Sequence, residues 1–392
     1  MGNEGRNHAI EKAYRREKFV MPRELTYLAG NSLGPAVASV ADRLARISND
    51  QWGQHLAGAW KKNGWLSAPE EIGDKISLLL GADQGTTLVC DSTSINLFKL
   101  LNAALAVDPQ RKVILTDQGN FSTDLYIAKS VGLIHRDVTV RIVPRSTLVE
   151  SLDPSVAVLM LSHVDYRSGQ AHDMASFNEK ARSVGALTLW DVSHSVGIMA
   201  LDFNVSGVDM AVGCGYKYLN GGPGAPAFVY VKADLQNTLS NPIQGWLGHA
   251  EPFVFSDNYV PASGIKRLQV GTPTTFSLAA LEEGVDLLLE AGIQLVEHDS
   301  RELFDAFMAG LEPLVRKGHV HFMHDVQRGN VSGHIGFKVN DAEALHHRLM
   351  AENIVTEYRY PDLLRIAFNP LYTTVDEIKR TAAKLKHLLG QH

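Results

Sequence analysis

The sequence contains only two cysteines, Cys90 and Cys214, among its 392 residues. Two thiols are too few for the disulfide framework of a small secreted protein, and they suit a reducing cytosol. No apolar run approaches the roughly 18 residues that a membrane span requires. The first ten residues, MGNEGRNHAI, are polar and lack the apolar core of a signal peptide. We therefore expect a cytoplasmic protein that has no membrane partner.

An excess of positive charge is also missing. The chain has 37 lysines and arginines against 43 aspartates and glutamates, which gives a formal net charge of −6. This balance gives no electrostatic reason to expect binding to nucleic acid. Hydrophobic residues make up 45% of the chain and charged residues 20%, as in an ordinary globular protein. A chain of this length is expected to form about two domains.

Short apolar runs rich in β-forming residues recur through the first two-thirds of the chain. They lie at residues 86–90, 112–116, 138–143, 156–161, 186–191, 208–213 and 226–231. Several runs are nearly continuous, which is typical of strands buried on both faces of a sheet. Helical patterns lie between them, for example at residues 94–106, 123–131 and 174–184. The alternation predicts an α/β fold with a mostly parallel seven-stranded sheet, whose ligands bind at the carboxyl ends of the strands.

The pattern changes after residue 271. Residues 276–316 predict two helices separated near Gly292, and further elements follow as strands at 334–339 and 363–368 and helices at 341–352 and from about residue 374. This part predicts a smaller α+β domain. We expect a division into an N-terminal segment (1–50) that joins the small domain and the mouth of the site, a large ligand-binding domain (51–275) and a small C-terminal domain (276–392).

Two charged residues follow apolar strands of the predicted sheet. Asp191 ends one strand, where a buried carboxylate is costly unless it is paired. Lys217 follows the next strand, in the glycine-rich segment GCGYKYLNGGPG at residues 213–224. Alone, Asp191 is more often a helix cap or part of a structural ion pair, and Lys217 a solvated surface lysine. Together they offer what pyridoxal 5'-phosphate (PLP) requires, an amine that bonds to the cofactor and a carboxylate for its pyridinium nitrogen.

Five segments narrow this interpretation further. They are YLAGNSLGP at residues 27–35, DSTSINLFK at 91–99, NFSTDLYIA at 120–128, GYKYLNGG at 215–222 and GWLGH at 245–249. These segments resemble, in the same order, signatures of the kynureninase family of PLP enzymes, which are similar to class V aminotransferases. The resemblance covers roughly residues 25–370. It implies the PLP-dependent transferase fold of type I, a homodimer with shared active sites, and hydrolysis of L-kynurenine to anthranilate and L-alanine in tryptophan catabolism.

The resemblance also implies a role for each matching residue. Lys217 is expected to hold the cofactor and move a proton, Tyr216 to act as an acid, and Asp191 to stabilise the pyridinium. Arg365 is expected to bind the substrate α-carboxylate, and Ser32 and Trp60 to contact the substrate. Trp246 and Thr272 would reach the cofactor phosphate from the neighbouring subunit, and no metal is expected. The full set of expected cofactor contacts is Thr93, Ser94, Phe121, Asp124, Ser162, Asp191, His194, Tyr216, Lys217, Trp246 and Thr272.

Some of these residues have ordinary structural interpretations when they are taken alone. Ser94 would be a helix N-cap, Phe121 a core aromatic, and His194 a structural histidine. Trp246 would be a buried indole, and Trp60 would pack against its own helix. These structural roles can coexist with the roles that the resemblance implies.

Four positions bear on substrate preference. Ser122 replaces the family's usual proline in the cofactor loop, and Leu247 stands where an aromatic residue or methionine is common. Trp60 matches the tryptophan of bacterial members, where animal members have histidine. Thr272 replaces an asparagine that animal members place near the ring hydroxyl. We therefore predict a bacterial-type enzyme that prefers L-kynurenine to 3-hydroxykynurenine.

Three alternatives stay open. Residues 30–34, GNSLG, match the G-x-S-x-G pattern of serine hydrolases around Ser32, but they lie too early in the chain for that fold. Another fold type I enzyme, an aminotransferase or a cysteine desulfurase, is the second alternative, although a desulfurase needs a mobile cysteine. The third is a binding protein with a metal at His163, His172 and His194, whose spacing matches no ligand motif.

Overall fold

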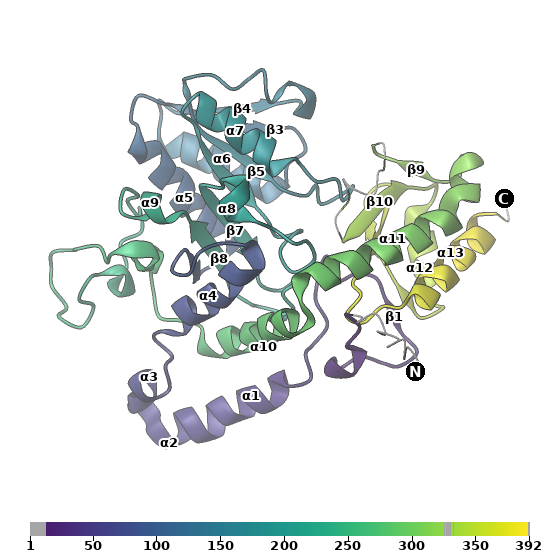
Figure 1. Cartoon of the computed structure of the whole chain (residues 1–392), viewed down its shortest axis with the longest axis horizontal. Helices are drawn as coiled ribbons and strands as arrows, with labels where there is room; N and C mark the ends of the chain where they lie inside the picture. The colour runs from purple at the N-terminus through teal and green to yellow at the C-terminus, as the bar shows by residue number, and fades with distance from the viewer. Residues whose placement is uncertain (1–12, 325, 327–330, 332, 391–392) are drawn as a thin grey trace, which may run out of the picture.

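A seven-stranded sheet forms the centre of the larger part of the chain (Figure 1). The computed structural model describes residues 13–324, 326, 331 and 333–390. The strand order is β2-β8-β7-β6-β5-β3-β4, and β8 (Ala227–Val231) runs antiparallel to both of its neighbours, β2 and β7, while the other pairs are parallel. The others are β2 (Thr87–Val89), β3 (Val113–Asp117), β4 (Thr139–Val143), β5 (Val156–Ser162), β6 (Leu187–Asp191) and β7 (Met210–Cys214). The predicted α/β fold with a mostly parallel seven-stranded sheet is confirmed.

Helices cover both faces of this sheet because its strands are apolar on both sides. Along β5, Leu159 and Leu161 belong to one hydrophobic cluster, and Val158 and Met160 to another on the opposite face. This alternation follows from the two-residue period of a strand. The first cluster includes residues of α4 (Ala68–Leu80), α7 (Met174–Ser183) and α10 (Thr275–Ala291), and the second includes residues of α5 (Thr93–Val107) and α6 (Ser122–Ile134).

A four-stranded antiparallel sheet, in the order β12-β13-β10-β9, forms the second part of the fold. Its strands are β9 (His321–Phe322), β10 (His334–Lys338), β12 (Glu357–Arg359) and β13 (Leu363–Ala367). On β13, Leu364 and Ile366 point into a third hydrophobic cluster with α11 (Ile293–Arg316), α12 (Ala342–Met350) and α13 (Val375–Leu389). Arg365 lies between these two residues and therefore faces the other way.

The N-terminal segment joins the smaller part. Leu28 is buried in the third cluster, and β1 (Thr26–Tyr27) pairs in parallel with β11 (Ile354–Val355). The predicted helix break near Gly292 is confirmed, since that glycine (φ +80) separates α10 from α11. In Figure 1, α11 extends from the end of α10 to the small sheet. The predicted division assigns α10 to the small C-terminal domain, but this helix packs on the large sheet. The boundaries at residues 50 and 275 therefore stay a proposal.

The remaining elements are short. Helices α1 (Val40–Arg46), α2 (Gly53–His55) and α3 (Ala59–Lys62) precede α4, and α8 (Phe203–Ser206) and α9 (Ala233–Gln236) follow β6 and β8. Single turns form η1 (Arg16–Lys18), η2 (Ile47–Trp52), η3 (Leu56–Gly58), η4 (Arg145–Thr147), η5 (Trp246–Gly248) and η6 (Gly264–Leu268). Within the described residues, no helix has both the length and the apolar character needed to cross a bilayer. The polar residues 1–10 discussed above lie outside this description.

Candidate active site

The carboxyl ends of β6 and β7 bring Asp191 and Lys217 to one cavity. Asp191 is the last residue of β6 and pairs in parallel register with Val212 of β7, and Lys217 follows three residues after that strand ends. Parallel strands end at the same edge of a sheet, so the two side chains meet there. Both line a cavity of about 290 Å³. The structure therefore places the amine and the carboxylate as the sequence predicts.

His194 contacts the lysine directly. The Lys217 Nζ lies 2.9 Å from His194 Nε2. Burial, and then the positive charge of Lys217, hold the pKa of His194 well below its ordinary value. The imidazole is thus neutral at physiological pH, and its Nε2 accepts the hydrogen bond that the lysine donates. His194 is therefore a hydrogen-bond partner of Lys217 as well as a buried histidine.

Two carboxyl groups lie together at the base of the cavity. Burial and the adjacent Asp191 carboxylate raise the pKa of Asp124 well above its ordinary value. Two neighbouring carboxylates cannot easily ionise together, so Asp124 retains its proton beside Asp191. The Ser162 hydroxyl lies 2.5 Å from Asn120 Oδ1 and 3.4 Å from Asp124 Oδ2. The pair therefore presents about one negative charge to a cationic group in the cavity.

The beginning of α5 lines another side of the same cavity. Its residues Ser92, Thr93 and Ser94 contribute hydroxyl groups there, as does Thr123. The N-cap is Ser92, whose Oγ accepts from Ile95 N at 3.4 Å, so the expectation of an N-cap at Ser94 is wrong. Thr93 and Ser94 are instead the first two residues of the helix. Free backbone N–H groups and the helix dipole make this end suitable for a phosphate.

Aromatic residues complete the wall of the cavity. Phe121 and Tyr166 pack edge to face with ring centroids 5.3 Å apart, and the Phe121 ring lies 6.0 Å from Lys217 Nζ. Tyr216, at 5.8 Å from the same nitrogen, is partly exposed. Burial, followed by the charges of Cys214 and Asp191, raises the pKa of Tyr216. Its phenol is therefore protonated at neutral pH and can donate a proton.

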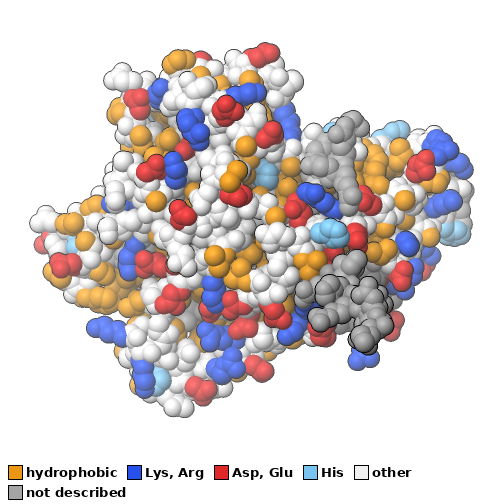
Figure 2. Space-filling view, in the orientation of Figure 1, with side chains coloured by type: hydrophobic (Ala, Val, Ile, Leu, Met, Phe, Trp, Pro, Cys, Tyr) orange, Lys and Arg blue, Asp and Glu red, His pale blue; other side chains and the backbone are white. Residues whose placement is uncertain are grey.

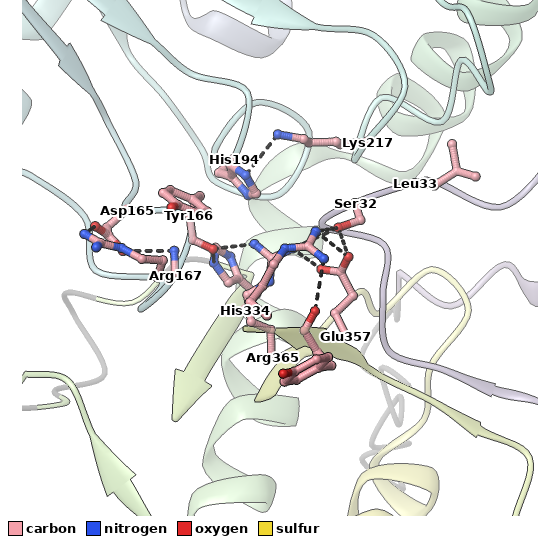
Figure 3. A network of polar contacts seen from close by, with 12 residues as sticks. Ser32, Leu33, Asp165, Tyr166, Arg167, His194, Lys217, His334, Glu357 and Arg365 are labelled. Atoms are coloured by element: carbon pink, nitrogen blue, oxygen red, sulfur yellow. Dashed lines mark hydrogen bonds and ion pairs between the residues drawn. The ribbon is translucent and has the colours of Figure 1, made fainter. Parts of the chain in front are cut away.

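Arg365 and Ser32 lie beside this cavity rather than in its wall (Figure 3). Arg365 is fully buried, and its guanidinium donates to the Tyr166 carbonyl, to Ser32 Oγ at 2.9 Å and to the Glu357 carboxylate. Burial lowers the pKa of Arg365, and the adjacent Glu357 opposes that shift. The structure thus joins Arg365 and Ser32, as an anion site would require, and adds a carboxylate that the sequence analysis does not foresee.

Three predicted site residues lie elsewhere in the protomer. Trp60, Trp246 and Thr272 line a separate cavity of about 580 Å³ together with Phe253. Trp246 packs on Phe253 and Phe255 with centroids 5.8 and 6.5 Å apart. Within one protomer these three residues therefore do not meet Lys217.

Sequence reasoning misses Tyr166, His334, Glu357 and Arg359, which connect the two parts of the site. His334 lies with its ring centroid 5.0 Å from that of His194. Arg359 donates to Glu357 Oε1 at 2.8 Å. The one local signal near the last two is the pair of turn residues Pro361 and Asp362, which follow them and are typical of a hairpin; three residues are too few to show a strand period.

The other candidate sites fail in the structure. The Ser32 hydroxyl bonds to Glu357 and Arg365 rather than to a histidine, so no serine hydrolase triad forms there. Among the described residues, the group whose ligand atoms could share a metal ion is His298, Asp299 and Glu302 on α11. The histidines at 163, 172 and 194 form no such group.

The residues that line the Lys217 cavity fit PLP by their chemistry. An amine, a carboxyl pair, a partly exposed aromatic ring and the beginning of a 15-residue helix surround the same space. These groups correspond to the aldehyde, the pyridine nitrogen, the ring face and the phosphate of that cofactor. The cavity at Trp60, Trp246 and Thr272 also contains lysines, but no carboxyl group lines it.

The chain is similar to known proteins of one family. The family model for aminotransferase class V matches residues 39–357. The chain is 36% identical over 384 residues to a kynureninase of Deinococcus radiodurans, with 97% of this chain and 93% of that protein covered. It is also 36% identical to a kynureninase of Pseudomonas fluorescens over 369 residues, which cover 93% of this chain and 89% of that protein.

Solved structures with a similar fold include two cysteine desulfurases. One from Thermococcus onnurineus has a TM-score of 0.82 at 15% sequence identity, with 96% of this chain and 98% of the other covered. One from Escherichia coli has a TM-score of 0.78 at 18% identity, with coverage of 96% and 98%. At these identities the likeness concerns the fold alone.

Proposed function

We propose that this chain, which belongs to the kynureninase family within aminotransferase class V, is a PLP-dependent hydrolase that cleaves L-kynurenine to anthranilate and L-alanine. The observation that carries the proposal is the cavity that joins Lys217, Asp191 and the beginning of α5 in a chain of this family. Bound PLP supplies an electron sink that stabilises negative charge at carbons of the substrate next to its amino group. The protein's own residues must bind, orient and move protons.

Lys217 is placed to hold the cofactor and to move the proton at the substrate Cα. Its Nζ points into the cavity and donates to the neutral His194. This contact holds the Lys217 side chain at the cavity, where its amine can bond to the cofactor. Asp191, with protonated Asp124 beside it, supplies a single negative charge for the pyridinium nitrogen.

Tyr216 is our candidate for the acid of the cleavage step. Hydrolysis adds water to the γ-carbonyl of the substrate, and the Cβ–Cγ bond then breaks, with a proton delivered to Cβ. The raised pKa of Tyr216 keeps a proton on its phenol, and the ring borders the Lys217 cavity. The phenol can hydrogen-bond to the carbonyl oxygen and then give a proton to Cβ.

The substrate α-carboxylate fits Arg365. Among the described residues, its Nε has no hydrogen-bond partner although the side chain is fully buried. A buried arginine donor without a partner is costly, and a ligand carboxylate would satisfy it by a charge-assisted bond. Ser32 Oγ, 2.9 Å from the same guanidinium, is placed to contact the same carboxylate.

A second copy of the chain is the proposed partner, because one protomer does not assemble all the expected residues. Trp246 and Thr272 line a cavity apart from Lys217. Around Trp246 an apolar surface is exposed, including Phe253, Val254 and Phe255, the last 75% exposed. Hydrophobic atoms gather on the left of Figure 2, where the loop between α9 and α10 extends from the body in Figure 1. A patch of this kind marks a protein–protein interface.

A mixing experiment tests the shared site. Lys217→Ala and Trp246→Ala proteins should each be inactive or nearly so. Mixed in equal amounts and allowed to exchange subunits, they should regain about a quarter of the wild-type activity, since half the dimers are mixed and each has one intact site. A mixture as inactive as its components would contradict sites shared between subunits.

The aryl side of the site includes Trp60, which lies in the same cavity as Trp246. We propose that this mostly apolar lining favours L-kynurenine over 3-hydroxykynurenine, since Thr272 stands where animal members place an asparagine near the ring hydroxyl. Comparison of kcat/KM for the two substrates tests this, and a preference for the hydroxylated one would contradict it.

Two further points support the proposal. A cysteine desulfurase needs an accessible thiol, but both cysteines of this chain, Cys90 and Cys214, are buried. The same two thiols are free rather than joined, which supports a cytoplasmic location. An aminotransferase would instead transfer the amino group of a donor amino acid to a keto acid. Incubation with pyruvate and an amino donor tests this alternative, since an aminotransferase would form alanine without releasing anthranilate.

A further inference from the structure

The register of the small sheet places an acid directly opposite Arg365. In the antiparallel pair of β12 and β13, Glu357 faces Arg365, and on the other side of β13 the partner of Arg365 is Gly336 of β10. Directly opposed residues of antiparallel strands have their Cβ atoms about 5 Å apart, so the Glu357 and Arg365 side chains must meet. Neither residue can turn into the apolar cluster behind the sheet without leaving its strand position.

Glu357 contacts two arginines at once. Its Oε2 accepts from Arg365, and its Oε1 accepts from Arg359 Nη2 at 2.8 Å. Arg359 lies two residues further along β12, on the same face of the strand. Ser32 Oγ joins the group, since it donates to Glu357 and accepts from Arg365 and from Arg359, the latter at 3.3 Å. Figure 3 shows Ser32, Glu357 and Arg365 of this network on the small-sheet side of Lys217 and His194.

The charges of this network leave one positive charge. Arg359 and Arg365 contribute two, and Glu357 removes one. The nearby rings of His194 and His334 add none, because burial lowers the pKa of both, that of His334 to about 3. Arg365 donates to the carbonyl of Tyr166, a residue that lines the Lys217 cavity, so the network lies at the edge of that cavity. A net charge of +1 matches one carboxylate.

Close backbone packing fixes the position of the Tyr166 carbonyl, which accepts a hydrogen bond from Arg365. A side chain at Gly336 would place its Cβ 1.7 Å from the Arg167 carbonyl oxygen, so only glycine admits the backbone of residues 165–168 at this point. That backbone supplies the Tyr166 carbonyl to which Arg365 donates. Arg365 is therefore held by a carboxylate from β12, a hydroxyl from the N-terminal segment and a carbonyl from the large part of the chain.

We propose that Glu357 is a positioning residue that holds Arg365 and Arg359 in place to bind the α-carboxylate of the substrate. This rests on the proposed function, which supplies the carboxylate. An arginine loses considerable side-chain freedom when it is fixed, and an arginine that is already fixed binds its ligand without that cost. The contact lies away from the bond that breaks, so it contributes to binding of the substrate more than to the chemical step.

Glu357→Gln tests the proposal because it removes the charge but keeps the shape. We expect KM for L-kynurenine to rise about 10- to 100-fold while kcat changes less than about threefold, as for the loss of a charge-assisted contact in binding. Glu312→Gln is the matched control. Glu312 also pairs with an arginine, Arg316, but on an exposed helix face, and its loss should leave KM unchanged.

A second measurement separates positioning from general damage to the site. L-Alanine and ethylamine share an amino group, but only L-alanine has an α-carboxylate. In Glu357→Gln, inhibition by L-alanine should weaken by the same factor as KM rises, and inhibition by ethylamine should stay the same. An unchanged KM, or equal weakening for both inhibitors, overturns the proposal.

The outcomes also separate this proposal from the proposed function. If the wild-type protein released no anthranilate, the proposed function would fail, and calorimetric binding of L-alanine and ethylamine to the cofactor-loaded protein would still decide the role of Glu357. If Glu357→Gln failed to fold, Glu357→Asp would decide, since it keeps the charge on a shorter side chain. A rise in KM of about 3- to 10-fold supports positioning, and an unchanged KM overturns it.

Discussion

Acid should destabilise this protein through His334 in a way that can be measured. The ring is fully buried, and its Nε2 faces the Tyr166 carbonyl at 3.3 Å. Burial, followed by the charge of Arg365, lowers the pKa of His334 to about 3 from an ordinary value of 6.5. Below about pH 6.5 the unfolded chain binds a proton at this histidine, and the folded chain does not. The stability that the neutral ring contributes is therefore present above pH 6.5 and is lost as the pH falls toward 3.

The magnitude follows from proton linkage. Between about pH 7.5 and about pH 5.5, this one ring should reduce the free energy of unfolding by about 1–2 kcal/mol. His334→Gln removes the titrating group. Between the same two pH values, the unfolding free energy of this variant should therefore fall by about 1–2 kcal/mol less than that of the wild type. Urea titrations of both proteins at the two pH values, at constant ionic strength, give the difference. His347→Gln, which removes an exposed histidine of α12, is the matched control. Equal losses in wild type and His334→Gln would refute the reasoning.

Three further variants test other parts of the account. Asp191→Asn should lower kcat about 100-fold or more, because it removes the negative charge at the cavity; steady-state kinetics with saturating cofactor would measure this, and an unchanged kcat would exclude that role. Gly336→Ala should destabilise the fold by about 1–3 kcal/mol, measured by urea unfolding, because its Cβ meets the Arg167 carbonyl; a stability like that of wild type would argue against the close packing. Phe255→Asp should weaken the proposed dimer in sedimentation experiments, and an unaffected dimer would place the interface elsewhere.

The large sheet could be predicted because its strands carry a strong signal. All seven apolar runs became strands of one sheet, with ends that differ by a few residues at most. Burial on both faces demands continuous apolar sequence, and this is easy to recognise. The meeting of Asp191 and Lys217 followed from topology alone, since neighbouring parallel strands end at one edge.

Short elements gave no comparable signal. β1, β11 and β12 have two or three residues, too few for any periodicity. Their pairing depends on contacts between distant segments, such as Thr26 with Ile354, and these are set by the tertiary structure. Glu357 was missed for this reason, because its importance depends on the register between β12 and β13.

The N-cap error has a local cause. Ser92, Thr93 and Ser94 are all residue types that cap helices well, so composition could not choose among them. The backbone before these residues decides which of them is the N-cap. Asp91 has a φ of +50, and the helix begins two residues later, at Thr93, with Ser92 as its N-cap. Trp246 and Thr272 could not be placed at the Lys217 cavity from one chain, because they act, as we propose, in the neighbouring subunit.

Release of anthranilate from L-kynurenine is the direct test of the proposed activity. Anthranilate is fluorescent, so its appearance can be followed continuously after the cofactor-loaded protein is mixed with L-kynurenine. We expect turnover by the wild-type protein and its loss in Lys217→Ala, whose fold can be checked by its unfolding transition. No anthranilate from the wild-type protein, or turnover retained by Lys217→Ala, would contradict it.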